Sequence, residues 1–270
     1  MEFRLLGTMS VAAALGSTPT APKPRQVLAL LLTHANRPVP TSLLVEELWG
    51  EHPPATAVRT LQTYVFQLRR RFAEAARGAG GAAERQLIHT GAASYLLRVD
   101  ERQVDVTEFR RLARLGRVAL AEGRYDQAAR LLAAALALWR GPALADIRTG
   151  RPLTMQAVRL EEDRLAVLER RIDADLRAGL PYQELIGELS ALAVAYPLNE
   201  GICHRLMTLL CLARRRSEAI TVYHRLRSRL VEEFGMEPSS ELRELYQRVI
   251  CDELELPSAG VALGSTPLAG

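Results

Sequence analysis

The sequence has a single lysine and lacks long apolar runs, and each of these absences removes a class of function. The lysine, Lys23, is followed by Pro24, so the chain has no Gly-Lys-Ser/Thr loop of the kind that binds nucleotide phosphates. No apolar run comes close to the length of about 20 residues that is needed to span a bilayer. The amino-terminal residues MEFRLLG contain no hydrophobic signal core. We therefore expect a soluble, cytoplasmic protein with no membrane partner and no P-loop chemistry.

Cysteine and histidine are also scarce, and neither is grouped. Cys203, Cys211 and Cys251 form no Cys-x-x-Cys pair, and the five histidines show no metal-ligand spacing and have no nearby nucleophile. The adjacent carboxylates Glu46-Glu47 and Glu161-Glu162 point about 100° apart on a helix, which does not suit paired-carboxylate catalysis. The sequence thus predicts no catalytic site, no metal site and no cofactor.

The positive charge is confined to the amino-terminal part of the chain. Residues 1–100 hold ten arginines, one lysine and seven acidic residues, whereas residues 101–270 hold 24 basic and 24 acidic residues. A basic surface attracts phosphates and releases their counterions. This distribution indicates a nucleic-acid partner for the first part and ion-paired helical surfaces for the second.

Short strands and helices are expected over residues 1–100. β-capable segments cover residues 2–6 and 9–13, and helices are expected from Pro24 to Asn36, from a cap at Thr41 or Ser42 to Gly50, and from Thr56 onward. The segments QLIHT and SYLLRV are strands joined through Gly91. Strands, three helices and a β-hairpin in this order predict a winged helix-turn-helix.

From Val104 onward the apolar periodicity is helical, with breaks at glycine and proline. Helix pairs with small residues at regular intervals indicate tetratricopeptide-like repeats, which stack and leave a concave surface. The expected fold class is an α+β winged-helix DNA-binding domain over residues 1–100 followed by an all-α repeat domain over residues 104–255. The tail, residues 256–270, is rich in Gly, Ala, Ser and Pro and is expected to be disordered.

The helix from Thr56 to Phe72 has two chemically distinct faces. Its core seam is formed by Val58, Leu61, Val65, Leu68 and Phe72, and its opposite face by Arg59, Thr63, Phe66, Gln67 and Arg70. Guanidinium forks, short polar groups and an aromatic ring suit phosphates, base edges and thymine methyl groups. We predict DNA contacts from Lys23, Arg25, Arg59, Thr60, Thr63, Phe66, Gln67, Arg69, Arg70, Arg71 and Arg98. Simple solvation is the alternative for Arg69 and Arg71, and helix capping is the alternative for Lys23 and Arg25.

Several long strings carry a family resemblance. They include PKPRQVLALLL, NRPVPTSLLVEELWGEHPPATAVRTLQTYVFQLRR, LALWRGPALADI and YPLNEGICHRLMTLLCLARRRSEAITVYHRLRSRLVEEFGMEPSSEL. The chain resembles the Streptomyces antibiotic regulatory protein (SARP) family of transcriptional activators. The resemblance implies a winged helix followed by a bacterial transcriptional activation domain. It also implies a homodimer, or protomers side by side, on a direct-repeat operator in double-stranded DNA.

The resemblance further implies recruitment of RNA polymerase holoenzyme, with its σ subunit, to genes of secondary metabolism. The loop at residues 50–55 would touch the polymerase, through Glu51, His52, Pro53 and Pro54. The predicted hairpin tip, residues 91–93, has no arginine, so Arg85, His89 or Arg98 would supply the contacts of the hairpin to the DNA backbone.

Two other functions fit the same residues. A helical-repeat adaptor or ligand sensor could use its winged helix for protein contacts alone, and salt dependence of DNA binding would distinguish it from a DNA-binding protein. A repressor would share the DNA-binding chemistry and differ in the position of its site. The sequence leaves open the operator, the regulated pathway, a ligand of the repeat domain and the oligomeric state away from DNA.

Overall fold

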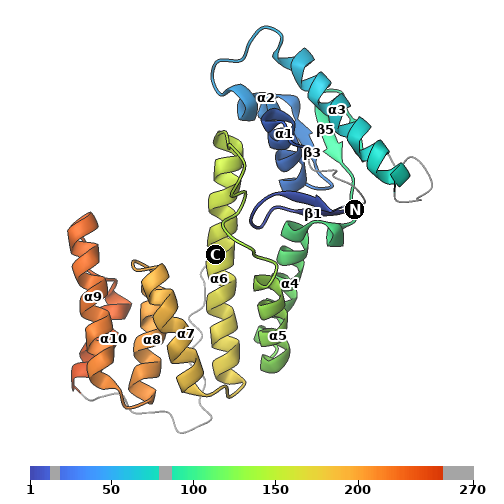
Figure 1. Cartoon of the computed structure of the whole chain (residues 1–270). Helices are drawn as coiled ribbons and strands as arrows, with labels where there is room; N and C mark the ends of the chain where they lie inside the picture. Colours follow the sequence, from blue (N-terminus) through green and yellow to red (C-terminus); the bar gives the residue numbers. More distant parts are fainter. Residues whose placement is uncertain (13–18, 79–86, 252–270) are drawn as a thin grey trace. The chain divides into compact units, whose positions relative to one another are not determined.

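The structure is a computed structural model that describes residues 1–12, 19–78 and 87–251 (Figure 1). Its contacts divide the chain into two compact units, Met1–Ala174 and Asp175–Gly270, and each unit is described by itself. The tail at 256–270, which we expected to be disordered, lies outside the described residues. The domain boundary at residues 100–104, which we expected from the charge distribution and the change to helical periodicity, stays a prediction.

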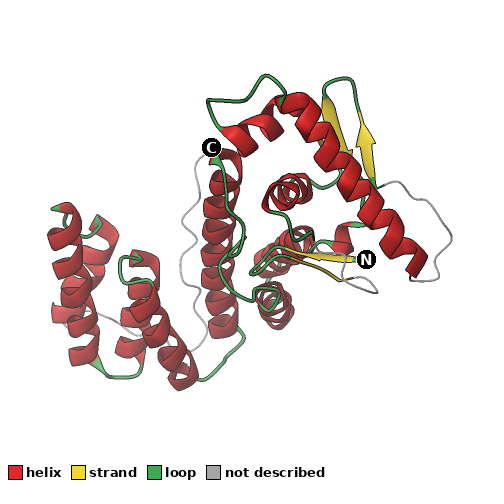
Figure 2. Cartoon of the chain, turned by 45° about the horizontal axis from the view of Figure 1, so that its top comes forward, coloured by secondary structure: helices red, strands yellow, loops and turns green. Residues whose placement is uncertain are grey.

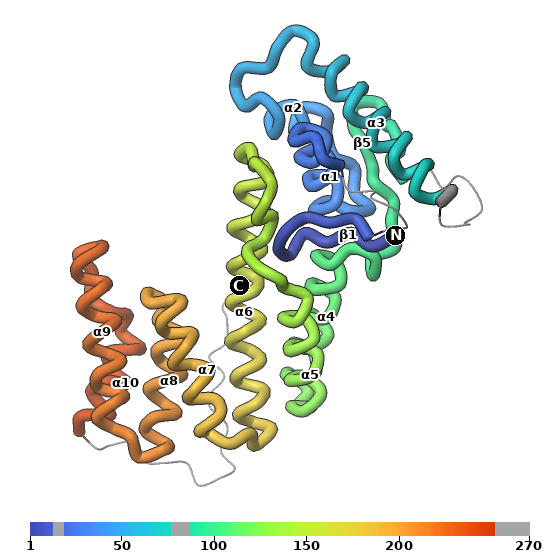
Figure 3. Tube along the Cα trace, in the orientation of Figure 1, coloured from blue at the N-terminus to red at the C-terminus, as the bar shows by residue number. Residues whose placement is uncertain are grey.

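An antiparallel hairpin opens the first unit. Strands β1 (Glu2–Arg4) and β2 (Ser10–Ala12) pair with Phe3 opposite Val11. Figure 3 shows this hairpin in dark blue beside the segment that precedes α6. The connection between the strands buries Leu5 and Leu6 completely, and Gly7 adopts a φ of 131° that favours glycine. The hairpin is therefore anchored by its turn and by its strands.

Three helices and a three-stranded sheet form the winged helix (Figure 2). The helices are α1 (Pro22–Thr33), α2 (Thr41–Trp49) and α3 (Ala57–Gly78), and the strands are β3 (Pro38–Pro40), β4 (Ile88–Thr90) and β5 (Ser94–Leu97). The antiparallel strand order is β3-β5-β4. Residues 27–32 of α1 are all buried, which explains why this helix shows a continuous apolar run.

Two local expectations were wrong. β3 was not predicted, because proline cannot donate a hydrogen bond to a strand ladder; the strand is possible here since it lies at the edge of the sheet. Val39, between the two prolines, is completely buried. We also expected Thr41 or Ser42 to cap α2, but Thr41 is its first residue and the capping position, Pro40, makes no side-chain hydrogen bond.

The first unit continues into the helical part of the chain. A 3₁₀ turn, η1 (Glu101–Gln103), leads to α4 (Asp105–Ala121), α5 (Tyr125–Leu136) and α6 (Arg151–Arg177). Gly116 allows α4 and α5 to approach closely, because a Cβ atom there would lie 2.6 Å from Cγ of Leu132. Phe109 and Trp139 pack edge to face with their ring centroids 5.4 Å apart. These helices thus share one core with the winged helix.

The second unit consists of α7 (Tyr182–Ala195), α8 (Glu200–Leu212), α9 (Arg216–Phe234) and α10 (Ser240–Cys251). α8 packs against both α7 and α9, and α10 packs against α8 and α9. Asn199 caps α8 by accepting a hydrogen bond from the Ile202 N–H at 2.8 Å. α9 ends at Phe234 and is capped by Gly235, whose φ of 65° is the left-handed conformation of a helix C-cap. The helical repeats expected here are present.

Candidate nucleic-acid interface

The inner face of α3 fixes this helix to the winged-helix core. Leu61 and Leu68 are completely buried, and Val65 and Phe72 are 1% and 5% exposed. The prediction for Val58 was wrong, since its side chain is 51% exposed. Val58 lies in the first turn at the edge of the buried stripe, and the smaller Ala57 takes the inward position. The stripe leaves the opposite face of α3 turned to solvent.

The outer face of α3 presents the side chains that the periodicity placed there. All five are exposed: Arg59, Thr63, Phe66, Gln67 and Arg70. The Phe66 side chain is 64% exposed, although a ring of this size normally gains by burial. The Thr63 hydroxyl donates to the carbonyl oxygen of Arg59 at 3.2 Å and keeps its own oxygen as an acceptor. The surface combines cations, polar groups and one apolar ring.

Arg70 has a partner on the same helix. Its Nε donates to Oε1 of Glu74 at 2.9 Å, one turn further along, and both side chains are largely exposed. An exposed pair of this kind contributes little to stability. The Arg70 guanidinium can therefore exchange this carboxylate for another anion at small cost.

Arg69 binds the wing. Its Nε donates to the Ile88 carbonyl oxygen at 3.0 Å, and its Nη2 donates to the Thr90 hydroxyl at 2.7 Å. These bonds tie α3 to β4, so Arg69 orients the hairpin relative to α3. On the helix flanks Thr60 and Arg71 are half-buried.

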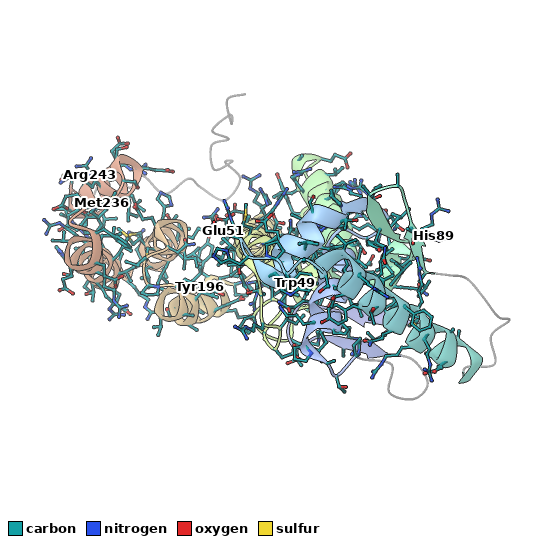
Figure 4. The ribbon with its side chains drawn as sticks, turned by 90° about the horizontal axis from the view of Figure 1, so that it is seen from above. Trp49, Glu51, His89, Tyr196, Met236 and Arg243 are labelled. Carbon is teal, nitrogen blue, oxygen red and sulfur yellow. The ribbon has the colours of Figure 1, made fainter. Side chains whose placement is uncertain are left out.

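The tip of the hairpin carries no charge. Its turn is closed by a hydrogen bond from the Gly91 N–H to the Ser94 carbonyl oxygen at 2.8 Å. Arg98 is exposed after β5, and His89 on β4 is half-buried and is labelled in Figure 4. Arg85, the third residue expected to contact the DNA backbone from this hairpin, lies outside the described residues.

Lys23 and Arg25 lie on α1, and both have partners within the chain. Lys23 donates to the Leu48 carbonyl oxygen and lies over the Trp49 ring, 5.7 Å from its centroid. Arg25 pairs with Asp146 and also donates to the Pro19 carbonyl oxygen at 3.3 Å. Both cations join α1 to neighbouring segments of the same unit.

The connection between α2 and α3 projects from the fold. Gly50 adopts a φ of 64°, and its N–H donates to the Glu46 carbonyl oxygen at 2.8 Å. The residues that follow are all exposed: Glu51, His52, Pro53, Pro54 and Ala55. Figure 4 labels Trp49, at the end of α2, and Glu51 beyond it. Two consecutive prolines restrict the backbone, so the loop presents a narrow range of shapes.

Glu47 was missed by the sequence reasoning and joins the winged helix to α6. Its side chain is 2% exposed and accepts hydrogen bonds from the backbone N–H groups of Gly150 at 2.6 Å and Leu153 at 2.9 Å. Burial raises the pKa of Glu47, although these N–H groups favour its charged form. The signal was present in the sequence, since Glu47 lies on the same helix face as Leu44 and Leu48.

A second carboxylate, Asp105 at the start of α4, holds the amino-terminal hairpin. It accepts hydrogen bonds from the N–H groups of Leu5 at 2.8 Å and Leu6 at 3.0 Å, and Arg140 Nη2 lies 2.8 Å away. Burial raises the pKa of Asp105, against the opposing effects of these N–H groups and Arg140. The backbone N–H groups of Arg140 and Leu144 donate back to Leu6 and Leu5 at 2.9 Å.

The described residues contain no group of three or more His, Cys, Asp or Glu side chains placed to hold a metal ion. Within the same ranges, no helix is both long enough and apolar enough to cross a membrane.

Comparison with known proteins assigns both parts of the chain. Residues 17–92 match the family described as transcriptional regulatory protein, C terminal, and residues 104–250 match the bacterial transcriptional activator domain. A winged helix followed by this helical domain defines a transcriptional regulator, which confirms the fold class predicted from the sequence. The family resemblance is confirmed as well: the chain belongs to the SARP family.

Individual relatives agree with this assignment. Regulatory protein DnrI of Streptomyces peucetius is 41% identical over 252 residues, which cover 93% of this chain and 92% of that protein. Transcriptional regulator RedD of Streptomyces coelicolor is 35% identical and covers 96% of this chain and 73% of its own length. The structure of Mycobacterium tuberculosis EmbR in complex with a low-affinity phosphopeptide has a TM-score of 0.83 at 32% identity. That match covers 93% of this chain and 65% of the EmbR chain.

Proposed function

We propose that this regulator binds double-stranded DNA in a sequence-specific manner and inserts α3 into the major groove. The outer face of α3 is the observation that carries the proposal. Arg59 and Arg70 provide guanidinium forks for phosphates or guanine edges, and the 64% exposed Phe66 provides an apolar contact for a thymine methyl group. Thr63 and Gln67 supply further hydrogen-bonding groups. Arg98 would contact the DNA backbone from the wing.

The role of the remaining predicted residues follows from their positions. Arg69 fixes the wing and acts on DNA through the placement of β4. Lys23 and Arg25 stabilise α1 and are left out of the proposed contact surface. Thr60 and Arg71, at the flanks of α3, remain candidates for phosphate contacts.

We further propose that the protein activates transcription as protomers placed side by side on direct repeats, at genes of secondary metabolism. The family resemblance supports this arrangement. In it, the exposed loop at residues 50–55 engages RNA polymerase holoenzyme at its σ subunit, in the cytoplasm where the nucleoid lies. A loop stiffened by two prolines loses little conformational entropy when it binds a partner.

The test of DNA recognition is a binding titration of the full chain on the promoter region next to its own gene. The double variant Arg59→Ala/Arg70→Ala should weaken DNA binding. Each lost contact between a guanidinium and a base edge should cost about 1–3 kcal/mol. Arg114→Ala/Arg117→Ala is the matched control, because both arginines are exposed on α4 and the charge change is the same. Equal affinity of the α3 variant and the wild type would remove α3 from the interface.

The salt dependence of the same titration distinguishes a DNA-binding protein from an adaptor. Neutralisation of phosphates releases counterions, so the logarithm of affinity should fall linearly as the logarithm of salt concentration rises. The slope should become less steep in Arg59→Ala/Arg70→Ala and stay unchanged in the α4 control. Absence of any salt-sensitive DNA binding by the wild type would favour the helical-repeat adaptor.

A further inference from the structure

Helices α7, α8 and α9 enclose a groove of about 410 Å³ within the second unit. Each helix lines it with residues spaced three or four positions apart, so a single face of each helix is turned toward the groove. The longest of these faces belongs to α9 and runs from Glu218 through Val222 to Arg229. The volume lies within the range of about 300–1,000 Å³ that is typical of ligand sites.

The inner surface of the groove is apolar. Its floor includes Leu206 and Leu210, each 2% exposed, and Cys203, which is 3% exposed. Burial raises the pKa of the Cys203 thiol to about 11, so the floor carries no thiolate charge at neutral pH. On the α7 side, the Val194 side chain is 71% exposed. Because Val194 is exposed beside an apolar floor, burial of its side chain against an apolar group of a bound ligand would be favourable.

The charge at the rim of the groove is positive. Arg225 and Arg229 line it from α9, and both are exposed. Among the residues that the structure describes, neither guanidinium has a hydrogen-bond or ion-pair partner. The third charged residue of the lining, Glu218, is held by Arg215 through bonds of 2.7 and 2.8 Å. An occupant that brings carboxylates would therefore meet two available guanidiniums.

The length of the groove indicates the form of its occupant. From Glu218 to Arg229 the helix rises about 16 Å, at about 1.5 Å per residue. An extended peptide advances about 3.3 Å per residue, so about five residues would fit along this face. Alternate side chains of an extended peptide point to opposite sides, which separates the apolar contacts from the charged contacts.

We propose that this groove binds an extended segment of a partner protein in which leucine-like residues alternate with acidic residues. The apolar side chains lie on the floor formed by α8, and the carboxylates pair with Arg225 and Arg229. Guanidinium and carboxylate groups form paired, charge-assisted hydrogen bonds, which fix the register of the segment. This binding site is independent of α3 and of DNA binding.

The test uses the full chain and a fluorescein-labelled peptide of about ten residues in which Glu and Leu alternate, so that it exceeds the length of the groove. Fluorescence anisotropy should show saturable binding. Arg225→Glu/Arg229→Glu should weaken it about tenfold or more, because two charge-assisted contacts become repulsive. Arg243→Glu/Arg248→Glu, an equal charge change at exposed positions of α10, should leave the affinity within about twofold. Circular dichroism checks that both variants are folded.

A second variant and a second peptide make the result unambiguous. Ala193→Trp places a bulky side chain in the groove without a change of charge and should also weaken binding. A peptide of alternating Lys and Leu should not bind. Equal binding of the two peptides, or unchanged affinity in both groove variants, would overturn the proposal.

The sequence after Cys251 reads DELEL, in which Glu and Leu alternate as they do in the test peptide. The last variant therefore tests whether this segment of the chain competes with the peptide. Deletion of residues 252–270 should leave the affinity for the acidic peptide unchanged. An increase of about tenfold would show that this segment competes for the groove and would overturn the assignment to a partner protein.

Discussion

Two buried carboxylates join segments that are far apart in the sequence. Glu47 accepts hydrogen bonds from the N–H groups at the start of α6. Asp105 accepts hydrogen bonds from the N–H groups in the turn of the amino-terminal hairpin. The first N–H groups of a helix have no partner within the helix, and a negative charge at that end is favourable. Each carboxylate therefore satisfies backbone donors that an apolar side chain of similar size would leave without an acceptor.

Replacement of Glu47 tests how much its hydrogen bonds contribute. Glu47→Ala should lower the free energy of unfolding by about 2–3 kcal/mol, since it leaves buried N–H groups without a partner. Glu46→Ala, next to it on α2, is the control and should change stability by less than about 0.5 kcal/mol. Urea unfolding followed by tryptophan fluorescence reports the first unit specifically, because Trp49 and Trp139 both belong to it.

The difference in unfolding free energy between wild type and Glu47→Ala should depend on pH. The pKa of Glu47 is raised in the folded state, so the folded protein binds this proton more tightly than the unfolded chain does. Stability from this group is fully present below its unfolded pKa of 4.5 and is lost as the pH rises through the raised value. The difference in unfolding free energy between wild type and Glu47→Ala should therefore be larger near pH 5 than near pH 7. A smaller difference at low pH would mean that the hydrogen bonds outweigh burial.

Gly150 and Gly187 should respond in opposite directions to the same substitution. A Cβ atom on Gly150 would lie 2.3 Å from the backbone oxygen of Glu47, so Gly150→Ala must displace α6 from α2 and should cost about 1–3 kcal/mol. Gly187 lies inside α7, and a Cβ atom there meets nothing within 4 Å. Gly187→Ala should stabilise the second unit by about 0.5–1 kcal/mol. Thermal unfolding by circular dichroism measures both, and destabilisation by Gly187→Ala would contradict this account.

At the scale of elements, α3 was the most predictable part of the chain, since it has one buried face and one exposed face. Helical periodicity separated its buried face from its outer face correctly, except for Val58 at the end of the stripe. Periodicity could not reveal that Arg69 binds β4 or that Arg70 pairs with Glu74, because these partners depend on side-chain conformation and on a strand about 20 residues away in the sequence. The DNA contacts assigned to the outer face stay a prediction.

Glu74 should oppose DNA binding. It forms an ion pair with the Arg70 guanidinium and places a negative charge on the helix face proposed for the major groove. Glu74→Gln should therefore tighten operator binding about two- to fivefold at low salt, with less effect at high salt. The control is Asp126→Asn, an equal charge change at an exposed position of α5. Weaker binding by Glu74→Gln would indicate that Glu74 orients Arg70 or accepts from a base.

The loop after α2 should separate activation from binding. Glu51→Ala/His52→Ala changes exposed side chains, so operator affinity should stay within about 0.5 kcal/mol of wild type. Transcription in vitro by the holoenzyme at saturating activator should fall, because the proposed contact between the polymerase and this loop is removed. If the variant occupies the operator equally and transcribes at the wild-type level, recruitment must be assigned to the helical repeats.

At the scale of the molecule, the proposed side-by-side arrangement makes a geometric prediction. Protomers on one face of B-DNA need half-sites about one turn, or about 10 base pairs, apart. Insertion of about five base pairs between the repeats should abolish cooperative binding, because the second protomer moves to the opposite face. Insertion of about ten base pairs is the control and should restore part of the cooperativity. Full cooperativity with the shorter insertion would rule out contact between neighbours.

The association of the winged helix with α4, α5 and α6 was beyond the sequence patterns. Periodicity identifies the faces that are buried but not the face that covers each of them. It placed Glu47 beside Leu44 and Leu48 but could not identify its partners, the Gly150 and Leu153 N–H groups. The motif strings did predict the winged helix and the helical domain in order, since each has its own local signature.

The hydrogen bonds of the turn at Leu5 and Leu6 bear on which segments can be exchanged between such regulators. A graft that replaced residues 1–100 with those of a relative would separate Leu5 and Leu6 from Asp105, and Glu47 from Gly150. The hybrid would then hold the Asp105 carboxylate opposite a foreign turn, and the N–H groups of Gly150 and Leu153 opposite a foreign α2. We expect a viable recombination point further along, within α6 near Ala174, where the first compact unit ends. The DNA-contacting surface proposed on α3 should therefore be inherited together with α4, α5 and α6.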